Sequence, residues 1–217
     1  MTETPFTAQD FANLADVSRE TFADFQAYET LLAKWNRKIN LVSPAAAKDF
    51  WGRHALDSWQ LAAMLPKSFE TLLDLGSGAG FPGIAMAIAS KQTGQGRVTM
   101  VESAGKKAAF LRTVIRELSL PATVWADRAE DMPPQPYDII TARAFAPLPR
   151  LLTYAHPFWG EDTTALLLKG QGAQEELTQA QISWIYNVTS TTSRSDPTGV
   201  ILQINDLAPR ADADPNT

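Results

Sequence analysis

Asp74, Gly76, Gly78 and Gly80 alternate with other residues in the stretch of this chain best suited to bind a small molecule. The stretch follows a short apolar run and precedes a second one, the arrangement of a turn between a strand and a helix. Such a turn aims the unpaired amides of the helix N-terminus at a ligand. The fingerprint of a dinucleotide-binding turn needs a further glycine at position 81, where this chain has Phe81.

Asp74 changes the ligand that this turn is expected to bind. A carboxylate beside the glycines disfavours a pyrophosphate, because it adds negative charge next to negative charge. It favours a cationic ligand with an ammonium group, while the glycines allow the backbone to approach closely. S-adenosylmethionine carries both an ammonium group and a sulfonium. The turn therefore predicts S-adenosylmethionine rather than NAD.

Two later positions support a nucleoside ligand. Glu102, followed by Ser103, ends the next apolar run, where an acid accepts hydrogen bonds from a ribose diol. Asp127, Arg128, Ala129 and Glu130 follow the run after that, in a loop that can present backbone and a side chain to an adenine edge. The alternatives are a solvated acid at a strand end for Glu102 and a helix N-cap region for Asp127 and Glu130. The glycine turn and these two positions, in this order, predict nucleoside binding.

The elements that must position these residues alternate along the chain. Short apolar runs predict strands at 71–75, 97–101, 122–126, 137–142 and 163–169, with helices at 82–91, 104–118, 147–158 and 173–182. This alternation implies right-handed crossovers and a mostly parallel sheet in an α/β fold. Two further runs, 183–189 and 200–205, predict an antiparallel pair at the sheet edge.

The chain is expected to have three parts. Residues 1–66 predict a helical extension, with a capping box at Thr7 and Asp10 and a third helix from Ser43 to about Leu65. Residues 67–206 form the predicted core, a class I (Rossmann-like) methyltransferase fold, and residues 207–217 predict a disordered tail.

Composition narrows the function further. The chain has no cysteine and two histidines, so we expect no disulfide, no zinc site and no cysteine nucleophile. No apolar run is long enough to cross a bilayer, and the N-terminus lacks the pattern of a secretory signal. We therefore expect a cytoplasmic protein without a membrane partner. No long apolar surface stripe stands out, which favours a monomer.

Charge is distributed unevenly along the chain. The net charge is −5, but residues 34–150 hold fifteen basic and ten acidic residues, whereas both flanking segments are acidic. A basic middle between acidic ends suits a protein that meets nucleic acid on one face. A chance fluctuation of surface charge explains the pattern equally well.

Several blocks of the sequence together carry a closer resemblance. From about Tyr28 to about Gln171 the chain resembles the bacterial 16S rRNA N7-guanine methyltransferases, historically called glucose-inhibited division protein B. The blocks are KWNRKINLVS (34–43), RHALDS (53–58), LLDLGSGAGFPGIAMAI (72–88), VESAGKKAAFLRTV (101–114), ADRAED (126–131), TARAFAPL (141–148) and LLLKGQ (166–171).

The resemblance implies transfer of a methyl group from S-adenosylmethionine to N7 of one guanine in 16S rRNA, free or within the small ribosomal subunit. It implies that Arg143 and Lys169 face the RNA or the target base as catalytic residues, with Arg143 also beside the cofactor. Asp74, Gly76, Gly78, Gly80, Phe81, Glu102, Ser103, Ala129, Glu130 and Arg143 are the candidate cofactor-binding residues, and no metal ligand is expected. His54, Asp57 and Asn40 match an N-terminal motif placed beside the site.

The resemblance weakens towards the end of the chain, and two other functions stay open. Family members often carry basic or histidine residues before the last strand, whereas this chain reads DPTGVILQIN, so the pattern gives no basis for an RNA contact there. One alternative is a class I methyltransferase that acts on a small molecule or a protein, which the acidic net charge favours. The other is a non-catalytic nucleotide-binding module in ribosome assembly.

Overall fold

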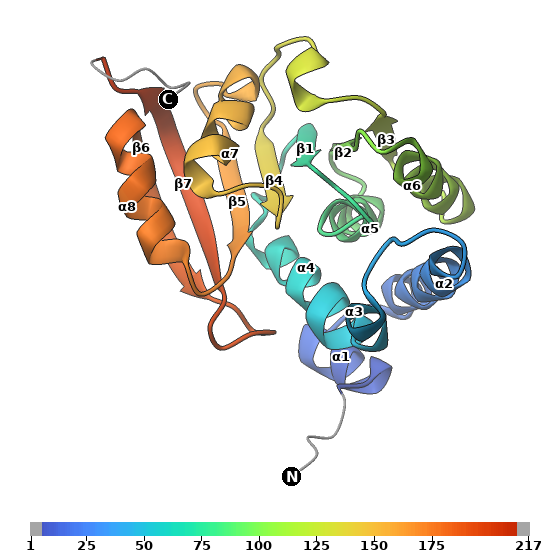
Figure 1. Ribbon diagram of the computed structural model, residues 1–217. Helices are drawn as coiled ribbons and strands as arrows, with labels where there is room; N and C mark the ends of the chain where they lie inside the picture. Colours follow the sequence, from blue (N-terminus) through green and yellow to red (C-terminus); the bar gives the residue numbers. More distant parts are fainter. Residues whose placement is uncertain (1–5, 212–217) are drawn as a thin grey trace.

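A seven-stranded sheet runs through the protein, whose computed structural model describes residues 6–211 (Figure 1). The strands are β1 (Thr71–Leu75), β2 (Arg97–Val101), β3 (Ala122–Trp125), β4 (Ile139–Arg143), β5 (Thr164–Lys169), β6 (Trp184–Thr192) and β7 (Val200–Pro209). Their order is β3-β2-β1-β4-β5-β7-β6. The first five are parallel, and β7 pairs antiparallel with both β5 and β6. The predicted parallel sheet with an antiparallel edge pair is confirmed.

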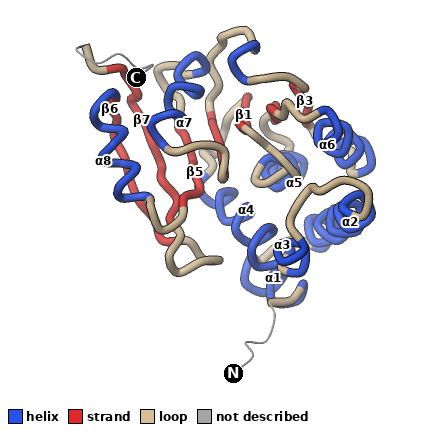
Figure 2. The backbone as a smooth tube through the Cα atoms, in the orientation of Figure 1, coloured by secondary structure: helices blue, strands red, loops and turns tan. Residues whose placement is uncertain are grey.

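Helices cover both faces of this sheet. They are α1 (Ala8–Ala15), α2 (Arg19–Asn36), α3 (Pro44–Lys48), α4 (Asp57–Trp59), α5 (Gly83–Thr93), α6 (Gly105–Glu117), α7 (Leu148–Ala155) and α8 (Ala173–Ser183), with the π-helical segment η1 (Phe50–Leu56) and the 3₁₀ turns η2 (Gln60–Met64), η3 (Ala129–Asp131) and η4 (His156–Phe158). In Figure 2, α8 lies on one flank of the molecule and α2 and α6 on the other.

Alternating side chains of the strands separate two hydrophobic cores. Leu72 of β1 packs with α2, η1, α5 and α6 on one face, whereas Leu73 and Leu75 pack with α7 and α8 on the other. A strand in a parallel sheet is buried on both faces, which is why β1 reads as a continuous apolar run broken only by Asp74.

The N-terminal helices share the core of the sheet. Phe11, Phe25 and Tyr28 are fully buried in the same cluster as Ile84 of α5. The Tyr28 hydroxyl donates a hydrogen bond of 2.5 Å to the carbonyl of Ala79 in the glycine turn. The helical extension therefore stabilises the glycine turn. The domain boundary at residue 66 stays a prediction.

The prediction of one continuous third helix is wrong. The helix breaks at Asp49, whose side chain accepts a hydrogen bond from the Arg53 amide. Side chains that bond the local backbone compete with regular helix formation. The chain continues as the π-helical η1, a rare form that is frequent at functional sites. The Arg53 carbonyl accepts a side-chain bond from Arg143 on β4, so this segment joins the N-terminal helices to the sheet.

The predicted tail begins too early. Strand β7 continues to Pro209, because Leu207 is buried and the Arg210 amide bonds to the Ser183 carbonyl. Residues 212–217 of the predicted tail lie outside the described residues.

Candidate functional site

The site lies where the strand order changes direction. β1 has β2 on one side and β4 on the other. The connection from β1 to β2 and the connection from β4 to β5 therefore leave in opposite directions. In open α/β sheets, ligands bind in the crevice that this leaves at the carboxyl ends of the strands. The glycine turn after β1, Glu102 after β2 and Arg143 at the end of β4 all meet there.

The first of two hollows at this edge, the glycine-turn hollow, has a volume of about 410 Å³. Its lining comprises Leu41, Val42, His54, Gly76, Ser77, Gly78, Ala79, Phe81, Val101, Glu102, Ser103, Lys107, Asp127, Arg128, Ala129, Glu130, Arg143, Ala144, Phe145 and Tyr154. All the predicted cofactor-binding residues except Asp74 and Gly80 line it.

Glu102 ties two sides of the glycine-turn hollow together. Its carboxylate oxygens accept hydrogen bonds from the amides of Gly78 (2.8 Å) and Ala104 (2.7 Å). A carboxylate has about four acceptor positions, so room remains for the hydroxyl donors of a ribose. The side chain is 8% exposed and still lines the hollow, so a ligand there could reach its free acceptor positions.

The first two glycines keep the floor of the hollow bare. A Cβ on Gly76 would lie 2.1 Å from the ring of Phe145, so only glycine lets this ring lie against the turn. Gly78 has a φ of +58°, and a Cβ there would meet only the Gly76 carbonyl, at an ordinary contact distance of 3.8 Å. A ligand can therefore approach the backbone directly at Gly78.

Asp74 and Gly80 lie beneath the turn and do not line the hollow, so their contact with the cofactor stays a prediction. The Asp74 carboxylate is fully buried and accepts hydrogen bonds from the Gly83 amide (3.1 Å) and the Thr141 hydroxyl (2.8 Å). Burial raises the pKa of Asp74 to about 6, against hydrogen bonds that lower it. A Cβ on Gly80 would meet the Tyr28 hydroxyl at 2.8 Å. Both residues hold the turn in place rather than facing the hollow.

The second hollow, the hairpin hollow, opens beside the first and has a volume of about 710 Å³. Its lining comprises Asp49, Arg53, Asp57, Arg143, Ala144, Phe145, Ala146, Pro147, Leu168, Lys169, Gly170, Glu176, Ser193, Ser195, Asp196, Pro197, Gly199 and Val200. The two hollows share a wall made of Arg143, Ala144 and Phe145. Ala144 has a φ of +49°, a conformation that costs energy for a residue with a side chain.

Arg143 is held firmly within the shared wall. Its guanidinium donates to the Asp57 carboxylate (2.9 Å) and the Arg53 carbonyl (2.8 Å), and it lies over the Phe81 ring. It also contacts His54 Nδ1 at 2.6 Å. Burial and the nearby arginines lower the pKa of His54 to about 3, so the ring is neutral and Nδ1 accepts this bond.

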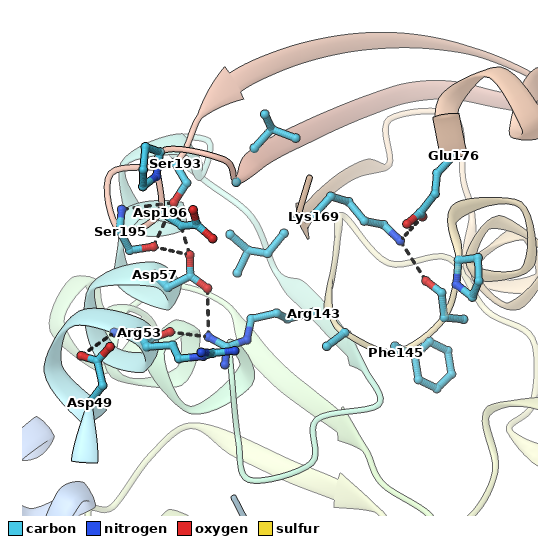
Figure 3. Close-up of a pocket in the computed structure, with 18 residues that line it drawn as sticks. Asp49, Arg53, Asp57, Arg143, Phe145, Lys169, Glu176, Ser193, Ser195 and Asp196 are labelled. Carbon is cyan, nitrogen blue, oxygen red and sulfur yellow. Dashed lines mark hydrogen bonds and ion pairs between the residues drawn. The ribbon is translucent and has the colours of Figure 1, made fainter. Parts of the chain in front are cut away.

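Asp57 joins three distant segments of the chain. Besides Arg143, its carboxylate accepts hydrogen bonds from Gln60 Nε2 (3.1 Å), Ser195 Oγ (2.6 Å) and Ser193 Oγ (3.4 Å). Both serines belong to the loop between β6 and β7. The end of β4, the N-terminal helices and this loop are thus connected through one carboxylate, as Figure 3 shows.

Lys169 occupies the opposite wall of the hairpin hollow. Figure 3 shows its side chain directed towards Glu176, with Nζ 2.7 Å from Glu176 Oε2 and 2.8 Å from the Ala146 carbonyl. The side chain is only 8% exposed. Both predicted catalytic cations therefore line the hollow but already have partners within the protein. That they contact RNA stays a prediction.

The loop between β6 and β7 contributes site residues that the sequence analysis missed. Ser193, Ser195 and Asp196 line the hairpin hollow, although the sequence indicated only a connection between two edge strands. Ser195 and Asp57 are 138 residues apart in the chain. The polar composition of the loop was visible, but no sequence pattern showed that it folds back onto the N-terminal helices.

Residues 6–211 contain neither a candidate metal centre nor a candidate membrane-spanning helix. No three His, Cys, Asp or Glu side chains in this range are grouped so that they could hold a metal ion. None of the helices described for this range is long and apolar enough to cross a membrane.

Solved structures place this fold in a known class. A TehB-like SAM-dependent methyltransferase from Corynebacterium glutamicum superposes with a TM-score of 0.55 at 18% identity, over 83% of this chain and 98% of the other. At this identity the likeness concerns the fold alone. The strand order, with the hollow at its switch point, is that of the class I S-adenosylmethionine-dependent methyltransferases.

The sequence comparisons narrow this class to one family. The chain belongs to the family described as GidB, rRNA small subunit methyltransferase G, whose model matches residues 21–197. A relative from Rhodospirillum centenum, named ribosomal RNA small subunit methyltransferase G, is 47% identical over 94% of this chain and 93% of its own length. A relative of the same name from Gluconobacter oxydans is 49% identical over 89% of this chain and 98% of its own. The resemblance inferred from the motifs is confirmed.

Proposed function

We propose that this protein transfers a methyl group from S-adenosylmethionine to N7 of one guanine in 16S rRNA. One observation supports this most directly. The glycine-turn hollow, at the switch point of the sheet, shares the lining residues Arg143, Ala144 and Phe145 with the hairpin hollow. A methyl donor in the first and a base in the second would meet where the two hollows adjoin. The names of the relatives support the choice of small-subunit rRNA as the acceptor.

The residues of the glycine-turn hollow fit the cofactor. Gly76 and Gly78 would lie against its methionine part, Glu102 against the ribose, and Ala129 with Glu130 against the adenine. The uncrowded backbone at Gly78 and the spare acceptor positions of Glu102 supply this fit. The bound cofactor would supply an electrophilic methyl group on its sulfonium.

The chain has only to orient the acceptor, because guanine N7 carries a lone pair and no proton to lose. No general base is needed, and His54, neutral and committed to Arg143, does not provide one. Orientation of two reacting groups can by itself lower a barrier by several kcal/mol. Arg143 should lie away from N7, because the product carries positive charge there. Its bonds to Asp57 and His54 hold it back in the wall.

The same proposal bears on location and assembly. A methyltransferase for rRNA would act in the cytoplasm, on 16S rRNA that is free or assembled into the small subunit. A complete pair of hollows within one chain supports a monomer as the active form. Sedimentation of the purified protein at working concentration would show a single species of about 24 kDa.

Nucleoside mapping of small-subunit rRNA from a deletion strain tests the proposal. We expect one 7-methylguanosine to disappear and to return when the intact gene is restored. If 7-methylguanosine persists at its full level, the proposal is wrong, and a small-molecule or protein acceptor takes its place. The deletion strain can also be complemented with a variant that is unable to bind the cofactor. If this variant restores the modification, the protein has a non-catalytic role in ribosome assembly instead.

A further inference from the structure

The hairpin hollow contains polar groups whose bonding capacity is already used. Arg143 is bound by Asp57 and His54, and Lys169 by Glu176. The carboxylate of Asp57 in addition takes bonds from Gln60, Ser193 and Ser195. These groups shape the hollow but have little left to offer a ligand.

Two side chains of opposite charge, Arg53 and Asp196, still have groups available to bind a ligand. The Arg53 side chain is exposed and makes no ion pair with any residue in the described part of the chain. In Asp196, Oδ1 accepts bonds from the amide and hydroxyl of Thr198, both 2.8 Å, while Oδ2 has no partner among residues 6–211. The hydrogen bonds from Thr198 lower the pKa of Asp196, so the side chain is an anion at neutral pH.

Asp196 is presented by a well-fixed turn. The Asp196 carbonyl accepts the Gly199 amide (3.0 Å), and the Ser193 amide bonds to the Gly199 carbonyl (2.9 Å). The loop is anchored to the N-terminal helices, because the Arg194 amide donates to Gln60 Oε1 at 2.8 Å. In Figure 3, Asp196 and Arg53 lie on the same side of the hollow, facing Lys169 across it.

The charges of the hollow favour a base over a phosphate. Three basic residues and four acidic residues line it, the acidic set being Asp49, Asp57, Glu176 and Asp196. An excess of carboxylates disfavours a phosphate group. Guanine instead presents the acceptor O6 beside the donors N1–H and the N2 amino group, which match a guanidinium beside a carboxylate. Adenine presents the opposite order on that edge.

We propose that Asp196 reads the target guanine, its carboxylate accepting hydrogen bonds from N1–H and the N2 amino group while Arg53 donates to O6. The inference rests on the proposed function and adds a specificity-determining residue to it. N7 lies on the other edge of the base, so this contact leaves it free to face the methyl donor where the two hollows adjoin.

Methyl transfer to 16S rRNA with guanine or inosine at the target position tests the inference, because inosine lacks the N2 amino group and keeps N7. The wild-type protein should modify inosine about tenfold more slowly than guanine or worse, since a site built around a donor rejects an analogue without it. Asp196→Ala should lower kcat/KM on guanine by about 10- to 100-fold and bring the two substrates to nearly equal rates. Cofactor affinity and Tm should stay at wild-type values, because Asp196 is exposed.

Two controls separate reading of the base from support of the loop. Thr198→Ala removes a hydrogen bond to the same carboxylate and should preserve the preference for guanine. Glu161→Ala removes an exposed carboxylate that lines neither hollow, and should preserve it too. If Asp196→Ala keeps the preference, or Glu161→Ala abolishes it, the inference is overturned. If the wild-type protein does not methylate guanine at all, the proposed function fails instead.

Discussion

At the scale of single residues, two carboxylates that the sequence places near the cofactor have different tasks. Glu102 lies at the surface of the glycine-turn hollow and bonds the amides of Gly78 and Ala104. Asp74 lies below the turn, where it bonds the Gly83 amide and the Thr141 hydroxyl. The first should therefore control affinity for the cofactor, and the second the stability of the fold and its dependence on pH.

Glu102→Ala should weaken binding of S-adenosylmethionine at least tenfold, about 1.4 kcal/mol. The substitution removes the proposed ribose acceptor and leaves the amide of Gly78 without its partner. Calorimetric titration measures the effect. Glu117→Ala is the matched control, since Glu117 is half exposed at the end of α6 and, among residues 6–211, pairs only with Arg116. Equal affinities of the two variants would contradict the assignment of Glu102.

Asp74→Asn should change how stability depends on pH. Burial raises the pKa of Asp74 to about 6, so its contribution to the free energy of unfolding is complete below about pH 4 and is lost as the pH rises through 6. Asparagine stays neutral and can still accept from Gly83, while the Thr141 hydroxyl can rotate to accept from its amide.

Relative to wild type, the free energy of unfolding of Asp74→Asn should therefore rise between pH 4 and pH 7.5, on the order of 2 kcal/mol. Urea unfolding at a series of pH values measures this difference. A difference that is constant over the range would mean that Asp74 titrates at the same pH in the folded and unfolded chain.

At the scale of elements, the glycine turn depends on the helices that precede it. The ring of Tyr28 on α2 and the side chain of Ile84 on α5 close over Gly80, whose φ is +102°. The N-terminal helices thus help to hold the glycine-turn hollow in place, and they also carry Asp57.

Gly80→Ala should lower the free energy of unfolding by about 2–4 kcal/mol, because a Cβ there meets the Tyr28 hydroxyl and a strained φ is required. Gly105→Ala is the matched control: a Cβ at this first position of α6 meets nothing within 4 Å. It should leave stability unchanged or raise it by up to about 1 kcal/mol. Urea unfolding compares the two, and similar losses in both would refute the role of Gly80.

The sequence predicts those parts of the fold and site that depend on local pattern. The alternation of strands and helices, the turn at Gly76–Gly80 and Glu102 after its strand follow from spacing alone, and the structure contains each of them. The break at Asp49 was not predictable, because it depends on one side chain bonding the backbone of Arg53. Nor was the closure of the β6–β7 loop onto Asp57, which depends on contacts between residues far apart in the chain.

At the scale of the whole molecule, the class I fold brings two hollows together at one edge of the sheet. The glycine-turn hollow sits at the switch point between β1 and β4, and the hairpin hollow lies between the N-terminal helices and the β6–β7 loop. The basic middle of the chain supplies the shared wall through Arg143, and the acidic C-terminal segment supplies Asp196. An overall net charge of −5 is therefore compatible with an RNA substrate that is bound locally.

Methyl transfer by the purified protein tests the central claim most directly. The protein would be incubated with S-adenosylmethionine carrying an isotopically labelled methyl group and with 16S rRNA, free and assembled, from cells that lack the gene. Digestion to nucleosides and mass spectrometry should find the label in 7-methylguanosine, at one equivalent per rRNA molecule. Label on another nucleoside, or no label in either form of the RNA, would contradict the account.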